Sequence, residues 1–223
     1  MLLLWLILLP VGTGLLAYAS SSTRVRTALL LGTAATHTAV VAFLWRNPDL
    51  VALGGWLASD ALGLMVLTVV SILFLTISTY AVGFLQVDRP RGGRIFVTCL
   101  LAFLAAATLV TLAHHLALVW IGMEATTLAL APLVFHRHDR RSLEAVWKYL
   151  VLSSVGIGLA LLGTFFLASA QVQGRPLLLE DLIKHADTLQ PGLLRGAFIF
   201  LLVGYGTKMG LAPLHAWKPD TYG

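Results

Sequence analysis

Long apolar runs place the strongest limit on how this chain can fold. The segment from residue 61 to residue 85 contains no charged side chain, and only 11% of the 223 residues are charged, against 58% that are hydrophobic. Soluble domains carry about 25% charged residues. An apolar run of about 18 residues or more is typical of a membrane-spanning helix, because hydrocarbon offers the backbone no hydrogen-bonding partners and a helix satisfies its own. The sequence therefore predicts an all-α integral membrane protein.

Seven such segments can be placed along the chain, and the last of them is interrupted. The predicted transmembrane helices cover residues 2–19, 27–45, 60–85, 95–111, 116–135 and 143–170, with a seventh from about residue 196 onward. Pro213 has no backbone N–H, so it predicts a break in the seventh helix. Asp60 is predicted to cap the third helix, and residues 177–189 to form a short interfacial helix. The first run is interpreted as a retained span rather than a signal peptide, because it continues past Pro10 and no basic residue precedes it.

The distribution of basic residues predicts the orientation in the membrane. The loops after the first, third and fifth spans hold eight arginines: Arg24, Arg26, Arg89, Arg91, Arg94, Arg137, Arg140 and Arg141. The alternate loops hold only Arg46, Arg175, Lys184 and the borderline Arg195. Basic loops face the cytoplasm. We therefore expect a multi-pass protein of the inner (plasma) membrane with its N-terminus outside. The net charge of +5 is then explained by basic loops that set the orientation, and does not indicate nucleic-acid binding.

One carboxylate lies in the middle of an apolar run. Glu124 stands in the predicted span 116–135, within Trp120-Ile-Gly-Met-Glu-Ala-Thr-Thr. A charge at the centre of a membrane helix costs about 3 kcal/mol on insertion scales, so such a residue is by default a candidate functional site. Desolvation favours the neutral carboxyl, whereas a nearby ammonium favours the carboxylate, so a moving partner could switch its protonation. The alternative is an ion pair that only holds the bundle together.

Two candidates for proton transfer lie in the seventh segment. Lys208 stands among small and apolar residues, five positions before Pro213. A lysine removed from water can lose and regain a proton near neutral pH; the alternative is a side chain that extends to the membrane surface. His215 follows Pro213 by two residues. Histidine suits proton relay, and the alternative is a solvated polar group near the surface.

A second lysine stands early in the sixth span. Lys148 follows Glu144 by four residues, a spacing that places both on one face of a helix. It is therefore either a relay between Glu124 and Lys208 or one half of an interfacial ion pair.

No pattern in the sequence indicates a cofactor or a metal. It contains no Gly-rich phosphate loop, no Walker motif and no Cys-x-x-Cys, and the single cysteine, Cys99, excludes an internal disulfide. The remaining histidines outside the seventh segment show no metal-ligand or haem-ligand spacing; they include His37, His114, His115, His136 and His138. Glycines in the sixth and seventh spans predict close helix approach instead. We expect no cofactor, no metal site and no redox chemistry in this chain itself.

Three ordered motifs carry a family resemblance. They are Trp120-x-x-x-Glu124, Lys148 in Glu-Ala-Val-Trp-Lys-Tyr-Leu, and Lys208 followed by Pro213-Leu-His-Ala-Trp-Lys-Pro-Asp220. Over residues 60–220 the chain resembles the proton-conducting, antiporter-like membrane subunits shared by respiratory complex I, Mrp-type cation/proton antiporters and membrane-bound group 4 hydrogenases. The residues after Glu124 and Lys148 are most similar to hydrogenase-4 component F. The resemblance implies that the glutamate and the helix-7 lysine form part of a proton half-channel coupled to a redox module.

The chain also departs from the family pattern. Lys218 stands where the family usually has an apolar residue, and residues 221–223 do not match the usual continuation. Family members have about fourteen helices in two inverted repeats. The resemblance thus implies three lead-in helices in residues 1–94, an incomplete first repeat in residues 95–223, and an N-terminal portion of the fourteen-helix fold.

The expected function is that of a proton-translocating membrane subunit, or its N-terminal part, in a hydrogenase- or NADH:quinone-oxidoreductase-like complex. The expected partners are other membrane subunits of such a complex, the lipid bilayer, and protons or sodium. Any enzyme activity would belong to the assembly. One alternative is a subunit of a stand-alone cation/proton antiporter or ion-coupled carbon-uptake system. Another is a non-functional fragment in which Glu124, Lys148 and Lys208 are relics.

Overall fold

A computed structural model describes residues 1–87, 93–137, 139–171 and 175–222, which are almost entirely helical. The chain divides into two compact units, residues 1–113 and residues 114–223. A compact unit need not coincide with an evolutionary repeat, so the expected division after residue 94 stays a prediction.

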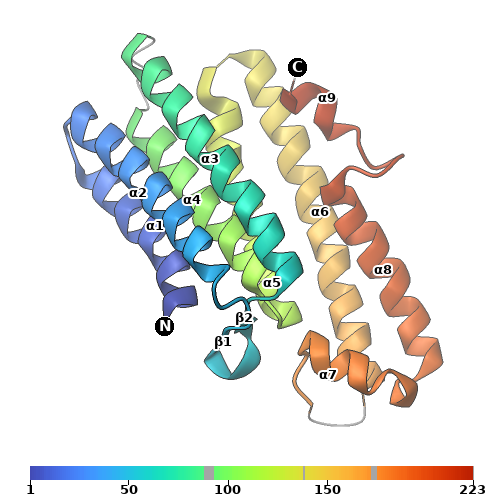
Figure 1. Ribbon diagram of the computed structural model, residues 1–223. Helices are drawn as coiled ribbons and strands as arrows, with labels where there is room; N and C mark the ends of the chain where they lie inside the picture. Colours follow the sequence, from blue (N-terminus) through green and yellow to red (C-terminus); the bar gives the residue numbers. More distant parts are fainter. Residues whose placement is uncertain (88–92, 138, 172–174, 223) are drawn as a thin grey trace. The chain divides into compact units, whose positions relative to one another are not determined.

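The first unit is a bundle of four long helices that lie side by side (Figure 1). They are α1 (Leu2–Ala19), α2 (Thr23–Leu44), α3 (Ala61–Val87) and α4 (Gly93–Leu112). Helix α1 packs on α4 and α2, and α2 packs on α3 and α4. Leucines fill the core, and Leu6, Leu30, Leu64 and Leu101 are completely buried. Many outward-facing side chains are also large and apolar, as in a bundle that faces lipid.

The loop between α2 and α3 folds into a small hairpin that the sequence did not indicate. It consists of β1 (Val51–Ala52), the 3-10 turn η1 (Leu53–Gly55) and β2 (Leu57–Ala58), with β1 antiparallel to β2. Asp60 follows, and its Oδ1 accepts a hydrogen bond from the Gly63 N–H at 2.9 Å. The predicted cap of the third helix is therefore confirmed.

The second unit contains the remaining helices. They are α5 (Leu116–Val134), the 3-10 turn η2 (Phe135–Arg137), α6 (Arg140–Ala170), α7 (Leu179–Lys184), the 3-10 turn η3 (Ala186–Thr188), α8 (Pro191–Met209) and α9 (Trp217–Tyr222). Helix α6 is central: α8 lies along it, and α5 and α9 also pack on it (Figure 1). A capping box starts α6, in which Asp139 Oδ1 accepts from the Ser142 N–H and Ser142 Oγ accepts from the Asp139 N–H.

The predicted spans agree with the observed helices to within a few residues. Among the described residues, six helices, α1 to α6, are by length and composition apolar enough to cross a membrane. Helix α8 takes the place of the predicted seventh span; it carries Arg195 and Lys208 and is not among those six. The chain is thus a multi-pass, all-α membrane protein. Arg89 and Arg91 and the side chain of Arg137, three of the arginines used to predict orientation, lie outside the described residues.

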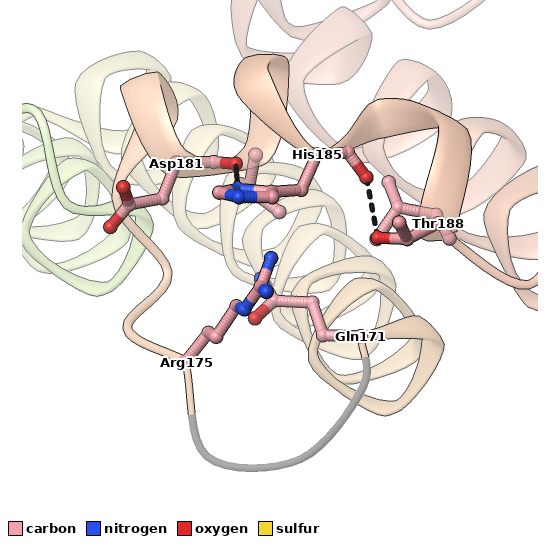
Figure 2. A pocket seen from close by; sticks show the side chains of 7 residues that line it. Gln171, Arg175, Asp181, His185 and Thr188 are labelled. Atoms are coloured by element: carbon pink, nitrogen blue, oxygen red, sulfur yellow. Dashed lines mark hydrogen bonds between the residues drawn. The ribbon is translucent and has the colours of Figure 1, made fainter.

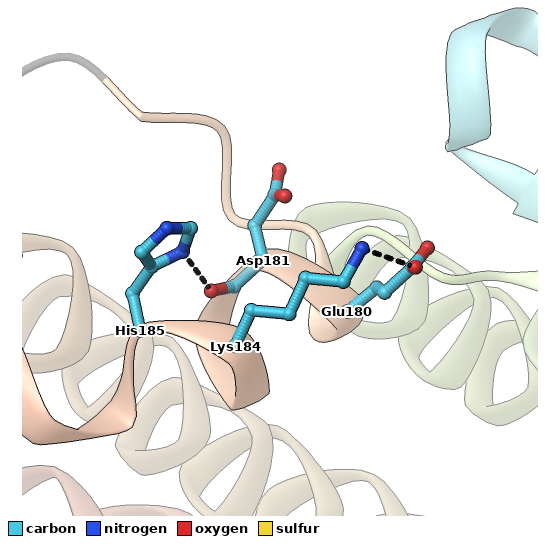
Figure 3. A network of polar contacts seen from close by, with 4 residues as sticks. All are labelled: Glu180, Asp181, Lys184 and His185. Carbon is cyan, nitrogen blue, oxygen red and sulfur yellow. Dashed lines mark hydrogen bonds and ion pairs between the residues drawn. The ribbon is translucent and has the colours of Figure 1, made fainter.

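The expected interfacial segment forms the short helix α7 and the turn η3. Its start pairs with the chain before α5, because the Leu116 N–H donates to Leu177 O and the Leu179 N–H donates to His114 O. On its exposed face Lys184 Nζ lies 2.7 Å from Glu180 Oε1 (Figure 3). The hydrogen bond and the charge attraction between these two side chains lower the pKa of Glu180 and raise the pKa of Lys184.

A histidine caps the N-terminus of α5, and this cap should respond to pH. His115 Nδ1 accepts from the Ala117 N–H at 3.2 Å, which only the unprotonated nitrogen can do. Burial lowers the pKa of His115 below the value of about 6.5 that it has in the unfolded chain. The cap is therefore fully present above about pH 6.5 and is lost as the pH falls through the lower pKa of the folded state. Hydrogen exchange of the first turn of α5, corrected for intrinsic rates, should rise below that pH by an amount equivalent to about 1 kcal/mol. His115→Asn should keep the first turn protected across this range, and pH-independent protection in the native chain would contradict the assignment.

Candidate functional site

One face of α5 carries the polar side chains of the site. Trp120, Glu124 and Thr127 are spaced i, i+4 and i+7, so they follow one another along the helix. Trp120 Nε1 donates to Ile157 O at 2.9 Å and thereby ties this face to α6. Thr127 is completely buried, and its hydroxyl donates to Met123 O. The face that bears Glu124 is therefore turned inward, toward the other helices of the unit.

Glu124 has a buried oxygen with no hydrogen-bond partner. Its Oε2 atom is inaccessible to solvent, and nothing among the described residues bonds to it. Buried polar atoms are nearly always paired, so an orphaned one marks a functional group or a water position. No ion pair engages this carboxylate within the described part of the chain. It is therefore not locked in a structural salt bridge, which was the alternative that its position in the sequence left open.

Lys208 joins all three long helices of the unit. Its Nζ donates to Thr127 Oγ1 on α5 at 2.5 Å and to Tyr149 OH on α6 at 3.1 Å. It also lies 5.3 Å from the centre of the Tyr149 ring, within the range of a cation–π contact. Glu124 exerts an electrostatic attraction on it. Lys208 is thus held by neutral partners beside a carboxylate that it does not pair with directly.

Close contact between α6 and α8 brings Lys208 to this position. A Cβ atom on Gly204 would lie 2.5 Å from Ala160 N and 2.7 Å from Gly156 O, so only glycine fits against the α6 backbone there. On the facing helix, a Cβ on Gly163 would lie 2.8 Å from Leu201 N. Small residues at such positions let membrane helices approach until their backbones touch. Lys208 follows Gly204 by one turn and therefore points into the same interface.

Helix α8 ends where the sequence indicates a break, although glycine rather than proline ends it. Gly210 adopts φ +72°, and the Leu211 N–H donates back to Gly206 O at 2.9 Å. These are the features of a left-handed helix stop, which favours glycine. Pro213 lies three residues further on, in the irregular link to α9.

The segment after the break folds back onto the end of α8. Trp217 is buried, donates from Nε1 to Thr207 O at 3.0 Å, and lies with its ring centre 5.3 Å from that of Tyr149. Lys218 Nζ donates to Met209 O at 2.7 Å. The lysine that departs from the family pattern thus satisfies a carbonyl at the C-terminus of α8, where a cation is favourable.

The other two candidates have different surroundings. Lys148 Nζ lies 2.7 Å from Glu144 Oε1, and both side chains are substantially exposed. This is the interfacial pair that the spacing allowed; a relay role for Lys148 stays a prediction. His215 is exposed, and no hydrogen bond links its ring to Lys208 among the described residues. Its part in proton transfer also stays a prediction.

Sequence reasoning missed Thr127 and Tyr149, which hold the lysine. Thr127 stands three residues after Glu124, on the same helix face, and that spacing was a usable signal. Tyr149 is 1% exposed, but only the fold shows that its hydroxyl meets Lys208.

A small hollow lies in a different region of the second unit. Gln171, Arg175, Asp181, His185 and Thr188 line it, between the end of α6 and α7 (Figure 2). None of the site residues contributes to it. No group of His, Cys, Asp and Glu side chains suited to a metal ion occurs within the described ranges.

Comparison with known proteins places this site in a family. Residues 113–223, which contain Glu124, Lys148, Tyr149 and Lys208, match the family described as NADH:quinone oxidoreductase/Mrp antiporter, transmembrane. Residues 113–223 belong to this family. The antiporter-family portion is thus the part of the chain in which Lys208 meets α5 and α6.

Relatives of this chain include subunits of respiratory and hydrogenase-like complexes. A hydrogenase-4 component F homolog from Methylacidiphilum infernorum is 38% identical over 60% of this chain and 29% of its own length. The NADH-quinone oxidoreductase subunit N of Halorhodospira halophila is 33% identical over 77% of this chain and 35% of its own. The chain spans about a third of the length of these curated relatives.

Solved structures share the fold of this chain. A chain of an archaeal respiratory complex, the membrane-bound sulfane sulfur reductase, superposes with a TM-score of 0.87 at 19% identity, over 99% of this chain and 47% of that one. A chain of respiratory complex I from Thermus thermophilus gives a TM-score of 0.80 at 26% identity, over all of this chain and 47% of that one.

Proposed function

We propose that this chain is a proton-translocating membrane subunit, or part of one, in a redox-driven complex related to the hydrogenases and NADH:quinone oxidoreductases. The observation that carries the proposal is the geometry of Lys208. It stands at the meeting point of α5, α6 and α8, hydrogen-bonded to Thr127 and Tyr149, with the unpaired Glu124 near enough to attract it.

Two titratable groups in this arrangement can exchange a proton by moving a short way. The ammonium of Lys208 and the carboxylate of Glu124 stabilise each other, so a proton added to Glu124 removes the attraction that favours the charged lysine. Lys208 can then release its proton to a water molecule, and the lone pair of the neutral amine can accept a hydrogen bond from the Tyr149 or Thr127 hydroxyl. Neutral hydroxyls keep the amine solvated in both protonation states, which a fixed salt bridge would not.

The broken helix supplies an element that can change position. The link between α8 and α9 is held by Trp217 Nε1 on Thr207 O and by the contact of Trp217 with Tyr149. Irregular backbone at membrane depth is tolerated where it lines a cavity or is buried in protein, and such segments build ion sites in transporters. A shift of Trp217 would move Tyr149 and thus change the hydrogen bonding of Lys208.

The redox partner and the membrane are part of the proposal. Relatives named as components of hydrogenase-4 and of NADH-quinone oxidoreductase support membrane subunits of such a complex as partners. We place the protein in the inner membrane with its N-terminus outside, as the basic loops predict. We also propose that it transports protons rather than sodium. A stand-alone cation/proton antiporter is the second candidate, favoured by the antiporters that share the family model. Sodium-dependent flux without any redox donor would decide for it.

Replacing the lysine tests the proposal. In membrane vesicles that hold the assembled complex, Lys208→Met should lower donor-driven proton flux by about 10-fold or more while electron transfer without a proton gradient continues. Lys184→Met, at an exposed lysine of α7, is the matched control and should leave the flux unchanged. Equal flux in both variants would reject the role of Lys208 and favour a chain without transport activity.

A further inference from the structure

A histidine that the proposed site does not use lies at the centre of the first unit. His37, on α2, is completely buried. Its Nδ1 lies 3.0 Å from Ser71 Oγ on α3, and its Nε2 lies 3.0 Å from Thr108 Oγ1 on α4. Ser71 and Thr108 are 1% and 0% exposed. One imidazole therefore bridges two hydroxyls across three helices that lie side by side (Figure 1).

The imidazole ring and the two hydroxyls have too few N–H and O–H hydrogens to make all four of these hydrogen bonds while the ring is neutral. Ser71 Oγ donates to Leu67 O at 2.7 Å, and Thr108 Oγ1 donates to Leu104 O at 2.7 Å. A hydroxyl has only one hydrogen, so both hydroxyls then present lone pairs to the ring. Only an imidazolium could donate to both. A neutral ring donates through one nitrogen and needs a hydrogen from the hydroxyl at the other.

The surroundings of His37 exclude a resting imidazolium. The described parts of α1, α2, α3 and α4 contain no Asp, Glu or Lys, and their charged residues, Arg24, Arg26 and Arg94, lie in the first turns of α2 and α4. Tyr18, Tyr80 and Cys99 are the other titratable side chains on these helices. An unpaired cation in the bundle would cost several kcal/mol. The ring is therefore neutral, and one hydroxyl at a time turns from its carbonyl to the imidazole.

The two arrangements of the neutral cluster have equivalent hydrogen bonding. In the first, Nδ1–H donates to Ser71 Oγ and the Thr108 hydroxyl donates to Nε2. In the second, Nε2–H donates to Thr108 Oγ1 and the Ser71 hydroxyl donates to Nδ1. In each, one i−4 carbonyl loses its hydroxyl donor while retaining its helix N–H. Because the number and kind of bonds are the same, neither tautomer is strongly preferred.

We propose that His37, Ser71 and Thr108 form a proton-exchange site inside the first unit, in which the imidazole passes a proton between the two hydroxyls. When water enters the bundle transiently, a water molecule gives a proton to Thr108 Oγ1 as the Thr108 hydroxyl proton moves to Nε2; the Nδ1 proton passes to Ser71 Oγ, and Ser71 gives its own hydroxyl proton to a second water molecule. One proton enters and one leaves, and the ring changes tautomer. Reverse passage or a ring flip restores the first state.

A second buried hydroxyl supports a route that continues from this site. Ser78 follows Ser71 by seven residues, two turns further along the same face of α3. It is completely buried, and its Oγ has no partner among the described residues. An unpaired hydroxyl in such a position suits a water molecule that hydrogen-bonds to it. Ser78 thus offers a second buried polar position on this face of α3, two turns away from Ser71.

Nitrogen NMR of the ring tests the proposal without any assumption about transport. The full chain, labelled with ¹⁵N-histidine in lipid bilayers at pH 8, should show both tautomers of His37, either as two populations or as an exchange average. Its signals are identified by their loss in His37→Gln. His185 is the internal control, because its Nδ1 faces a single acceptor, Asp181 O, at 2.9 Å (Figure 3). It should show one tautomer, Nδ1–H.

Removing either hydroxyl should leave the His37 ring in a single tautomer. Ser71→Ala should convert His37 wholly to the Nε2–H tautomer, and Thr108→Val wholly to Nδ1–H, whereas Thr108→Ser should retain both. A single tautomer or an imidazolium in the native chain would overturn the proposal, and so would tautomers that persist unchanged in Ser71→Ala and Thr108→Val. The native measurement uses His37→Gln only to assign the signals and needs neither hydroxyl variant, so a failure of Ser71→Ala or Thr108→Val to fold does not leave the proposal untested.

Discussion

Glu124→Gln is expected to reduce donor-driven proton flux by about 100-fold or more, the range in which loss of a proton-transferring group falls. Glutamine keeps the shape and polarity of the side chain but cannot bind or release a proton. Glu124 contributes a carboxylate oxygen that is fully buried and unpaired among the described residues. The measurement is proton uptake into vesicles that contain the assembled complex, together with the electron-transfer rate in the presence of an uncoupler.

The matched control for this variant is Glu180→Gln on α7. Glu180 is an exposed glutamate that pairs with Lys184 four residues on. Exposed pairs of this kind contribute little to stability because solvent screens them, so its loss should leave both flux and folding intact. If Glu124→Gln pumped as well as Glu180→Gln, the carboxylate would have a structural role only. The effect on Lys208 could then be tested independently, because Lys208→Met removes a different group.

Gly204→Ala is expected to separate α8 from α6 and to destabilise the second unit by about 3 kcal/mol or more, the upper range for overpacking. The added Cβ would meet Ala160 N, Gly156 O and Ala160 Cα, all at 2.8 Å or less. These are backbone atoms of a helix, so they cannot move aside as a flexible side chain could. Thermal unfolding of the chain in detergent should shift downward by roughly 10 °C.

Gly158→Ala on the neighbouring helix provides the comparison. A Cβ on Gly158 would meet nothing within 4 Å, so this change should be neutral or should stabilise α6 by up to about 1 kcal/mol through helix propensity. Equal unfolding temperatures for the two variants would contradict the close approach at Gly204. Because Lys208 follows Gly204 by one turn, Gly204→Ala should also weaken the contact of Lys208 with Tyr149 and lower the proton flux.

The break in the last long helix shows how far local sequence signals reach. Pro213 predicted an interruption, and the structure has one between Met209 and Trp217. The helix nevertheless stops at Gly210, because a glycine can adopt the left-handed conformation that lets the chain turn back and satisfy its terminal carbonyls. Lys218 caps one of those carbonyls, a contact that depends on the path of the turn and was not foreseeable from spacing.

The sequence by itself determined that this is a multi-pass helical membrane protein and where its helices run, and it predicted Glu124 and Lys208 as costly groups at membrane depth. These features follow from hydropathy and from the price of a charge in hydrocarbon, which act on each segment alone. Only the tertiary structure decided the partners of those groups. Lys208 meets Thr127 across 81 positions and Tyr149 across 59, and His37 meets Ser71 across 34 and Thr108 across 71. Such pairs depend on the rotation and contact depth of whole helices, which backbone-to-backbone packing at residues such as Gly204 sets.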